Sequence, residues 1–175
     1  MSSNYKRWQK FFLFCFGLFV AAAFCMKWME GDLKAGNEKF TVIGLEISYG
    51  REQLMTILGG LDERVRTILR YHLSFDFIFM VGVYPGIAGL CMMAREKQGG
   101  RVIRNLLLLL ACFQLIAWIC DIAENNWLFG WILKPNIEEA EFSFYHLFVW
   151  TKWVIVLSGA LLSIPLSLRS NRRIM

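Results

Sequence analysis

The stretch from Leu106 to Trp127 reads LLLLLACFQLIAWICDIAENNW: fifteen residues without a charge, then a run of acids and amides. Helical spacing places Asp121, Glu124 and Asn125 on one face. Ionisable groups at membrane depth are costly, so they face a bundle interior, a partner or water. The stretch therefore predicts a membrane helix that carries a polar site near one end.

The composition of the whole chain agrees with a membrane protein. The chain has 175 residues, of which 57% are hydrophobic and 15% aromatic, well above the usual values for soluble domains. A span needs about 20 mostly apolar residues. Four windows qualify, at about 11–28, 73–94, 102–122 and 144–168. We expect a single membrane domain over residues 1–175, with an all-α fold, an integral membrane four-helix bundle.

The distribution of basic residues predicts an orientation. Placing both termini in the cytoplasm collects ten basic residues and a single acid, Glu96, on that side: Lys6, Arg7, Lys10, Arg95, Lys97, Arg101, Arg104, Arg169, Arg172 and Arg173. By the positive-inside rule this predicts a multi-pass protein of the cell inner (cytoplasmic) membrane. The net charge of +5 is then a topology signal, and no nucleic-acid partner is expected. The first apolar run exceeds a signal-peptide core in length, so we expect a retained helix.

Residues 29–72, between spans one and two, are too patterned for a linker. The β-branched run 40–48 predicts an extended piece or a turn. Residues 51–58 predict a short helix ended by Gly59 and Gly60. A second helix begins near Asp62, which can cap it, and runs into span two. Together these pieces predict an amphipathic extracytoplasmic lid over the bundle mouth. In the second outer loop, 127–141, Trp127 and Trp131 are expected to be interfacial anchors.

Polar residues from separate spans are expected to share one depth. Asp76 lies about one turn inside the outer end of span two, level with the acids that end span three, and Tyr84 lies two turns below it. The candidate catalytic residues are Asp76, Asp121 and Glu124; the candidate substrate-binding residues are Glu46, Tyr84, Asn125, Lys152 and His146. The two histidines, His72 and His146, have the apolar body and polar tip typical of interfacial residues.

Two interpretations of this set compete. In the first, Lys152 pairs with Asp121 or Asp76, amide and phenol groups complete the hydrogen bonds, and the network is purely structural. In the second, carboxylates in excess of the one buried cation stay neutral or hold a cation, and serve acid/base work or metal-assisted attack on a lipid headgroup. Asp76, Asp121 and Glu124 would be the ligands of that divalent cation. Oxygen ligands favour Mg²⁺, Ca²⁺ or Mn²⁺, and His146 would extend the choice to Zn²⁺ or iron.

Small residues in span two indicate close helix packing. Gly82, Gly86 and Gly89 lie on one side of the helix and let a neighbouring backbone approach. The partner is expected to be span one, span four or a second copy of the chain. The sequence therefore leaves a homo-oligomer open, with membrane lipids as the other partners.

The order of these motifs resembles a known group. Gly44-Leu-Glu46-Ile, an amphipathic helix, Leu73-Ser-Phe-Asp76-Phe-Ile-Phe79 with Tyr84, and Asp121-Ile-Ala-Glu124-Asn125 are similar to small four-span bacterial membrane proteins of uncharacterised function. The resemblance covers about residues 40–128. It implies that the acids, Tyr84 and Asn125 act as one set.

Taken together, the sequence predicts an extracytoplasmic-facing acidic pocket within the membrane that binds or processes a lipid or other amphiphile. The alternative is a non-enzymatic component, either an accessory subunit or an oligomeric transport or pore unit, whose buried polar network is structural. Whether the protein is an enzyme stays open at this stage.

Overall fold

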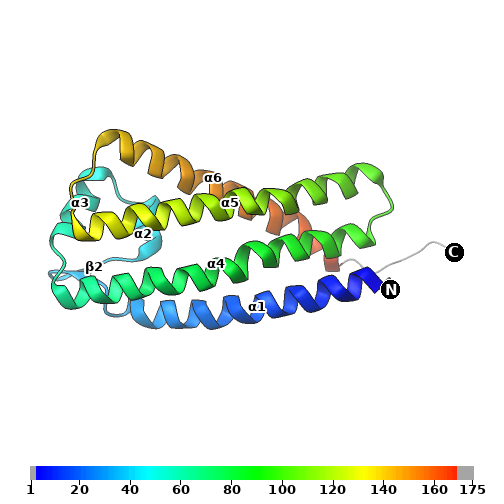
Figure 1. Cartoon of the computed structure of the whole chain (residues 1–175), viewed down its shortest axis with the longest axis horizontal. Helices are drawn as coiled ribbons and strands as arrows, with labels where there is room; N and C mark the ends of the chain where they lie inside the picture. Colours follow the sequence, from blue (N-terminus) through cyan, green and yellow to red (C-terminus); the bar gives the residue numbers. More distant parts are fainter. Residues whose placement is uncertain (1–2, 169–175) are drawn as a thin grey trace.

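Four long helices form the protein, and the computed structural model describes residues 3–168 of the chain. They are α1 (Ser3–Glu30), α4 (Glu63–Lys97), α5 (Arg101–Leu133) and α6 (Glu139–Leu168). Each is long and apolar enough to cross a membrane. They lie side by side as an elongated bundle, with the N-terminus at one end (Figure 1). The expected all-α membrane four-helix bundle is confirmed.

The helices extend beyond the apolar windows seen in the sequence. Helix α5, the third span, begins at Arg101 and continues to Leu133. The apolar window predicted for it ended near residue 122. Large apolar side chains such as Phe14, Phe24 and Leu161 are exposed on the outside of the bundle, as expected where lipid replaces water. Arg169, Arg172 and Arg173, which contribute to the orientation predicted above, lie outside the described residues. The choice of membrane and the orientation remain predictions.

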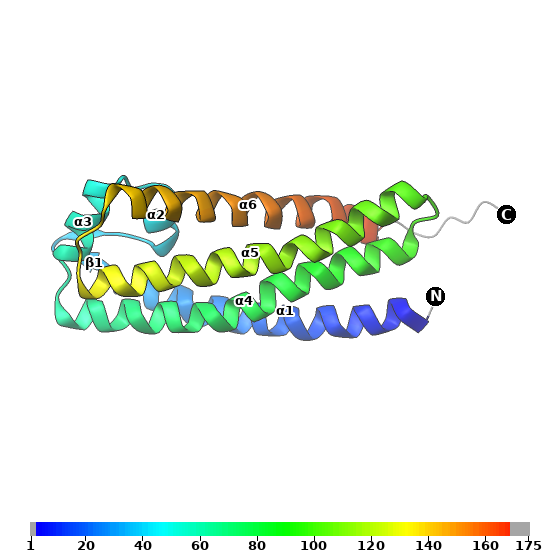
Figure 2. The same ribbon diagram turned by 45° about the horizontal axis from the view of Figure 1, so that its top comes forward.

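Helix α1 packs along α4, while α4, α5 and α6 pack on one another, an arrangement that can be followed in Figure 2. Glycine makes the first contact close: a Cβ on Gly82 would lie 2.6 Å from the backbone nitrogen of Phe19 and 2.9 Å from the carbonyl oxygen of Cys15. Such distances are shorter than any normal contact, so only glycine fits. The glycine face that was expected on span two (α4) is thus present, and it packs on span one (α1).

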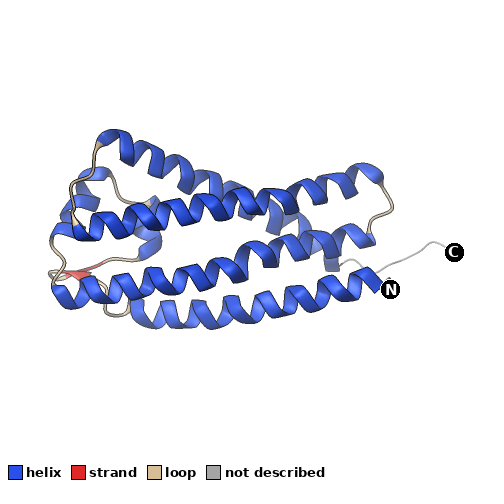
Figure 3. Cartoon of the chain, viewed as in Figure 1, coloured by secondary structure: helices blue, strands red, loops and turns tan. Residues whose placement is uncertain are grey.

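The segment between α1 and α4 folds at one end of the bundle, where Figure 3 shows its short strands and loops. It contains a two-stranded antiparallel hairpin, β1 (Lys34–Ala35) and β2 (Glu38–Lys39), followed by α2 (Val42–Ile47) and α3 (Arg51–Gly59). Gly36, with φ +60°, turns the hairpin. We call α2 and α3 the lid.

The expectation of an extended piece or a turn at residues 40–48 was wrong, because Val42–Ile47 form the helix α2. The Thr41 hydroxyl accepts a hydrogen bond from the Gly44 amide at 3.0 Å and caps a helix there. Val42 and Leu45 are buried in the core, and the Tyr145 hydroxyl of α6 donates to the Leu45 carbonyl at 3.3 Å. An N-cap and burial against α6 therefore outweigh the preference of β-branched residues for strands.

The other two predictions for this segment are confirmed. Helix α3 forms where expected, and Asp62 caps α4 by accepting a hydrogen bond from the Val65 amide at 2.8 Å. From there α4 continues without interruption to Lys97, with Pro85 inside it. The end of the outer segment therefore continues into the second span as one helix.

The second outer loop is shorter than expected, because α5 reaches Leu133 and α6 begins at Glu139. Trp131 is not an interfacial anchor: it is only 4% exposed and packs against Tyr145 with ring centroids 5.0 Å apart. Its indole nitrogen donates to Glu141 at 3.4 Å. The helix carries Trp131 inward, so it joins the core beneath the lid.

Candidate functional site

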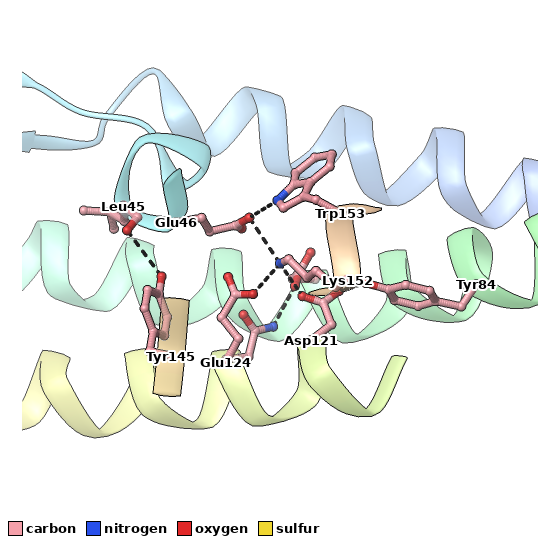
Figure 4. Close-up of polar contacts among 10 residues, drawn as sticks. Leu45, Glu46, Tyr84, Asp121, Glu124, Tyr145, Lys152 and Trp153 are labelled. Atoms are coloured by element: carbon pink, nitrogen blue, oxygen red, sulfur yellow. Dashed lines mark hydrogen bonds and ion pairs between the residues drawn. The ribbon is translucent and has the colours of Figure 1, made fainter. Parts of the chain in front are cut away.

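The ammonium group of Lys152, on α6, lies among three carboxylates from two other elements. Its Nζ is 2.6 Å from Asp121 Oδ1 and 2.6 Å from Glu124 Oε2, both on α5, and 3.1 Å from Glu46 Oε2 on α2. Figure 4 shows these side chains converging on the nitrogen. We call these four residues the Lys152 cluster. It ties the lid to two spans.

Neutral groups complete the arrangement. Tyr84 donates to Asp121 Oδ2 at 2.6 Å, and Asn125 donates to Asp76 Oδ2 at 2.6 Å, so α4 is joined to α5 twice. The indole of Trp153, next to Lys152, donates to Glu46 at 3.3 Å. The residues that the sequence singled out on four separate elements, His146 excepted, thus meet at one site.

The expected pairing of Lys152 with Asp121 is confirmed. The sequence did not foresee its other two partners, Glu124 and Glu46. Asp76, the alternative partner, is bound by the Asn125 amide. Within residues 3–168, no other Lys, Arg or His lies within 4 Å of these four acids. The side chains of Lys152 and of the four acids are each at most 9% exposed. Charges that are buried to this extent require such partners.

Glu46 belongs to the lid and not to a span. Burial raises the pKa of its carboxyl above the ordinary value, and the negative charge of Asp121 adds to this effect. The positive charge of Lys152 lowers this pKa; its effect is smaller than that of burial and larger than that of Asp121. Seating the lid against the bundle therefore costs desolvation of an acid, which protonation would relieve.

The expected metal ligands are not arranged as a metal site. In the part of the chain that the structure describes, no group of three or more His, Cys, Asp or Glu side chains has a geometry that could hold a metal ion. The Lys152 ammonium occupies the position between Asp121, Glu124 and Glu46. His146 lies apart from the cluster, against the ring of Phe142 at 4.5 Å between centroids.

A groove of about 880 Å³ runs along the bundle between α1 and α6, with α4 as its floor. It extends from Glu30 and Val42 near the lid to Tyr5 and Leu168 at the opposite end. Most of its lining is apolar. The polar exceptions include Glu46, Asp76, Asp121 and Lys152, which lie in the half nearer the lid.

Sequence reasoning missed two residues of this site. His72 is not interfacial: it is 2% exposed, lines the groove, and its Nδ1 has no hydrogen-bond partner among the described residues. It lies four residues before Asp76, a helical spacing that could have linked the two. Trp153 was also missed, because its role depends on the fold of the lid.

Fold and site together define a membrane four-helix bundle with buried carboxylates held in salt bridges. Comparison with protein-family models, with curated proteins and with solved structures finds no match to this chain. The function must therefore be inferred from the groove and the cluster themselves.

Proposed function

We propose that this protein binds a lipid or another amphiphile, with the apolar chain in the groove and the headgroup at the polar end of the groove, beside the Lys152 cluster. The observation that carries the proposal is the groove itself, which is apolar along its length and carries its buried charges near the lid. An amphiphile has the same division between a long apolar part and one polar end.

The apolar part of the groove suits an acyl chain. Phe12, Phe16 and Phe19 line it from α1, and Val156 and Ile164 line it from α6. A chain that moves from the bilayer into the groove exchanges one apolar environment for another, so the gain of about 0.8 kcal/mol for each methylene group removed from water does not apply. If the groove holds the amphiphile more tightly than the bilayer does, the additional affinity must come from the polar end of the groove.

The polar end favours binding over a reaction. Asp121 has both oxygens engaged, one by Lys152 and one by Tyr84. Glu46 and Glu124 are each within 3.1 Å of the ammonium. Acids that are already paired in this way are poorly placed to exchange protons with a headgroup. The extracytoplasmic orientation of this end is part of the proposal.

The competing function is an accessory or transport subunit in which the Lys152 cluster only holds the fold. Its support is the pairing of Lys152 with three carboxylates, which needs no ligand. The two functions differ in one consequence: filling the groove abolishes amphiphile binding only in the first.

The test is native mass spectrometry of protein extracted in a mild detergent. Ala160 lines the groove from α6, so Ala160→Trp should fill it and reduce the co-purified lipid several-fold. The matched control is Leu161→Trp, at the adjacent residue, which is 71% exposed on the outside of the bundle and should leave lipid occupancy unchanged. Equal occupancy in both variants, or no bound lipid in the unsubstituted protein, would overturn the proposal.

A further inference from the structure

We infer that the groove selects an amphiphile whose headgroup carries a primary amine, and that Asp76 and His72 receive it. This inference rests on the proposed function and adds the class of headgroup. It follows from three features of the site: its charge balance, the incomplete bonding of Asp76, and the buried histidine beside it.

The charge balance favours a cation. Among the described residues, two lysines and four carboxylates line the groove: Lys27, Lys152, Glu30, Glu46, Asp76 and Asp121. Lys27 is paired with Glu30 at 2.7 Å, and Lys152 is already surrounded by acids. An anionic headgroup would therefore meet no free positive charge, whereas an ammonium group would reduce the excess of negative charge.

Of the four carboxylates that line the groove among the described residues, Asp76 is the one without an ion pair. Within the described residues, its one hydrogen-bond donor is Asn125, which binds Oδ2 at 2.6 Å, and no ion pair reaches it. A buried carboxylate can accept several hydrogen bonds and is costly to leave with one. An ammonium group supplies both the missing charge and the missing donors.

His72 provides a second polar group at the same position. It lies one helical turn before Asp76 on α4, its ring lines the groove, and its buried Nδ1 is without a partner among residues 3–168. Neutral imidazole has one donor and one acceptor nitrogen. A primary amine, which offers up to three N–H groups, can donate to Asp76 and to the imidazole ring of His72 together, whereas a quaternary ammonium group has no N–H to donate.

The experiment uses three probes with the same C16 chain: hexadecylamine, hexadecanol and hexadecanoate, each at the same mole fraction in dodecylmaltoside micelles at neutral pH. Binding to the full chain is measured by native mass spectrometry and by the shift in thermal unfolding. We expect the amine to bind at least about tenfold more tightly than the carboxylate, as charge complementarity predicts. The protein's net charge of +5 would favour the carboxylate non-specifically, so overall charge cannot produce this preference.

Two variants test whether Asp76 produces the preference for the amine. Asp76→Asn keeps the shape of the side chain and an oxygen for Asn125, and should remove most of the advantage of the amine while hexadecanol binds as before. Glu138→Gln, at an exposed loop residue, is the control and should change nothing. Equal binding of amine and carboxylate, or an unchanged preference in Asp76→Asn, would overturn the inference but leave the proposed function standing. Failure of all three probes to bind the unsubstituted protein would overturn both.

Discussion

The hydroxyl of Tyr84 lies 2.6 Å from Oδ2 of Asp121, while the other oxygen of the same carboxylate lies 2.6 Å from Lys152. One acid on α5 is thus bound from α4 on one side and from α6 on the other. Its position defines how three of the four spans are arranged around the groove. The predictions below follow from this arrangement and from the contacts around it.

Removing the Tyr84 hydroxyl should destabilise the bundle. Tyr84→Phe keeps the ring, which stacks near Trp118, and deletes a donor to a buried carboxylate. A hydrogen bond to a charged group is worth about 1.5 to 3 kcal/mol, so we expect the free energy of unfolding in micelles to fall by about that amount. Tyr71→Phe, at a residue 61% exposed on the same helix, should have no effect; equal losses in both would contradict the prediction.

Removing the buried cation should have a larger effect. Lys152→Met preserves much of the length of the side chain but leaves three acids close together without a counter-charge. Breaking a buried ion pair by deleting one partner costs about 3 to 5 kcal/mol, measured here as the change in the free energy of unfolding. The control is Lys134→Met, at an exposed residue. An unchanged stability of Lys152→Met would mean that the acids are not ionised.

A side chain at Gly82 should separate α1 from α4. In Gly82→Val the new Cβ would collide with the backbone at Phe19, so α1 must shift. Cys15, which is 2% exposed at this contact, should then become reactive toward a maleimide, as read by peptide mass mapping. The control is Gly17→Val, because a Cβ on Gly17 meets nothing within 4 Å. Continued protection of Cys15 in Gly82→Val would show that the two helices are not in close contact.

The Glu46 carboxyl should make stability depend on pH. Its pKa is raised in the folded protein by burial, so the folded state holds this proton more tightly than the unfolded chain does. The resulting stabilisation is complete below the unfolded pKa and is lost as the pH rises through the folded pKa. Relative to Glu46→Gln, the unsubstituted protein should therefore lose stability on going from acidic to neutral pH.

The measurement is the thermal midpoint of both proteins in micelles across that range of pH. Glu52→Gln, on the exposed face of α3, is the control for general effects of acid and should follow the unsubstituted protein. A relative gain of stability with rising pH would mean that attraction to Lys152 outweighs the burial of Glu46.

The spans could be predicted from the sequence because lipid imposes a simple rule, a continuous apolar length, that one helix satisfies alone. The convergence of Asp76 with the acids of α5 was likewise accessible, since helical rise fixes the depth of each residue. Depth does not fix rotation about the helix axis. Which acids meet Lys152 is decided by rotation and packing, and so the pairing with Glu46 and Glu124 was not foreseen.

The lid and its surroundings were predicted less well for a related reason. A hydropathy window ends where charged residues begin, but α5 continues past Glu124 because its neighbours supply partners for those charges. That extension carries Trp131 into the core. The helical form of α2 depends on Leu45 being buried beneath Tyr145, a contact between residues 100 positions apart.

The close contact at Gly82 has a consequence for how a ligand enters. Helix α1 forms one wall of the groove, yet it supplies no residue to the Lys152 cluster. Because α1 lies outside that cluster, a displacement of α1 would change the width of the groove without breaking the ion pairs of Lys152. Under the proposed function, the wall of the groove and the anchor of the headgroup therefore belong to separate parts of the fold, and an amphiphile would exchange with the membrane beside α1.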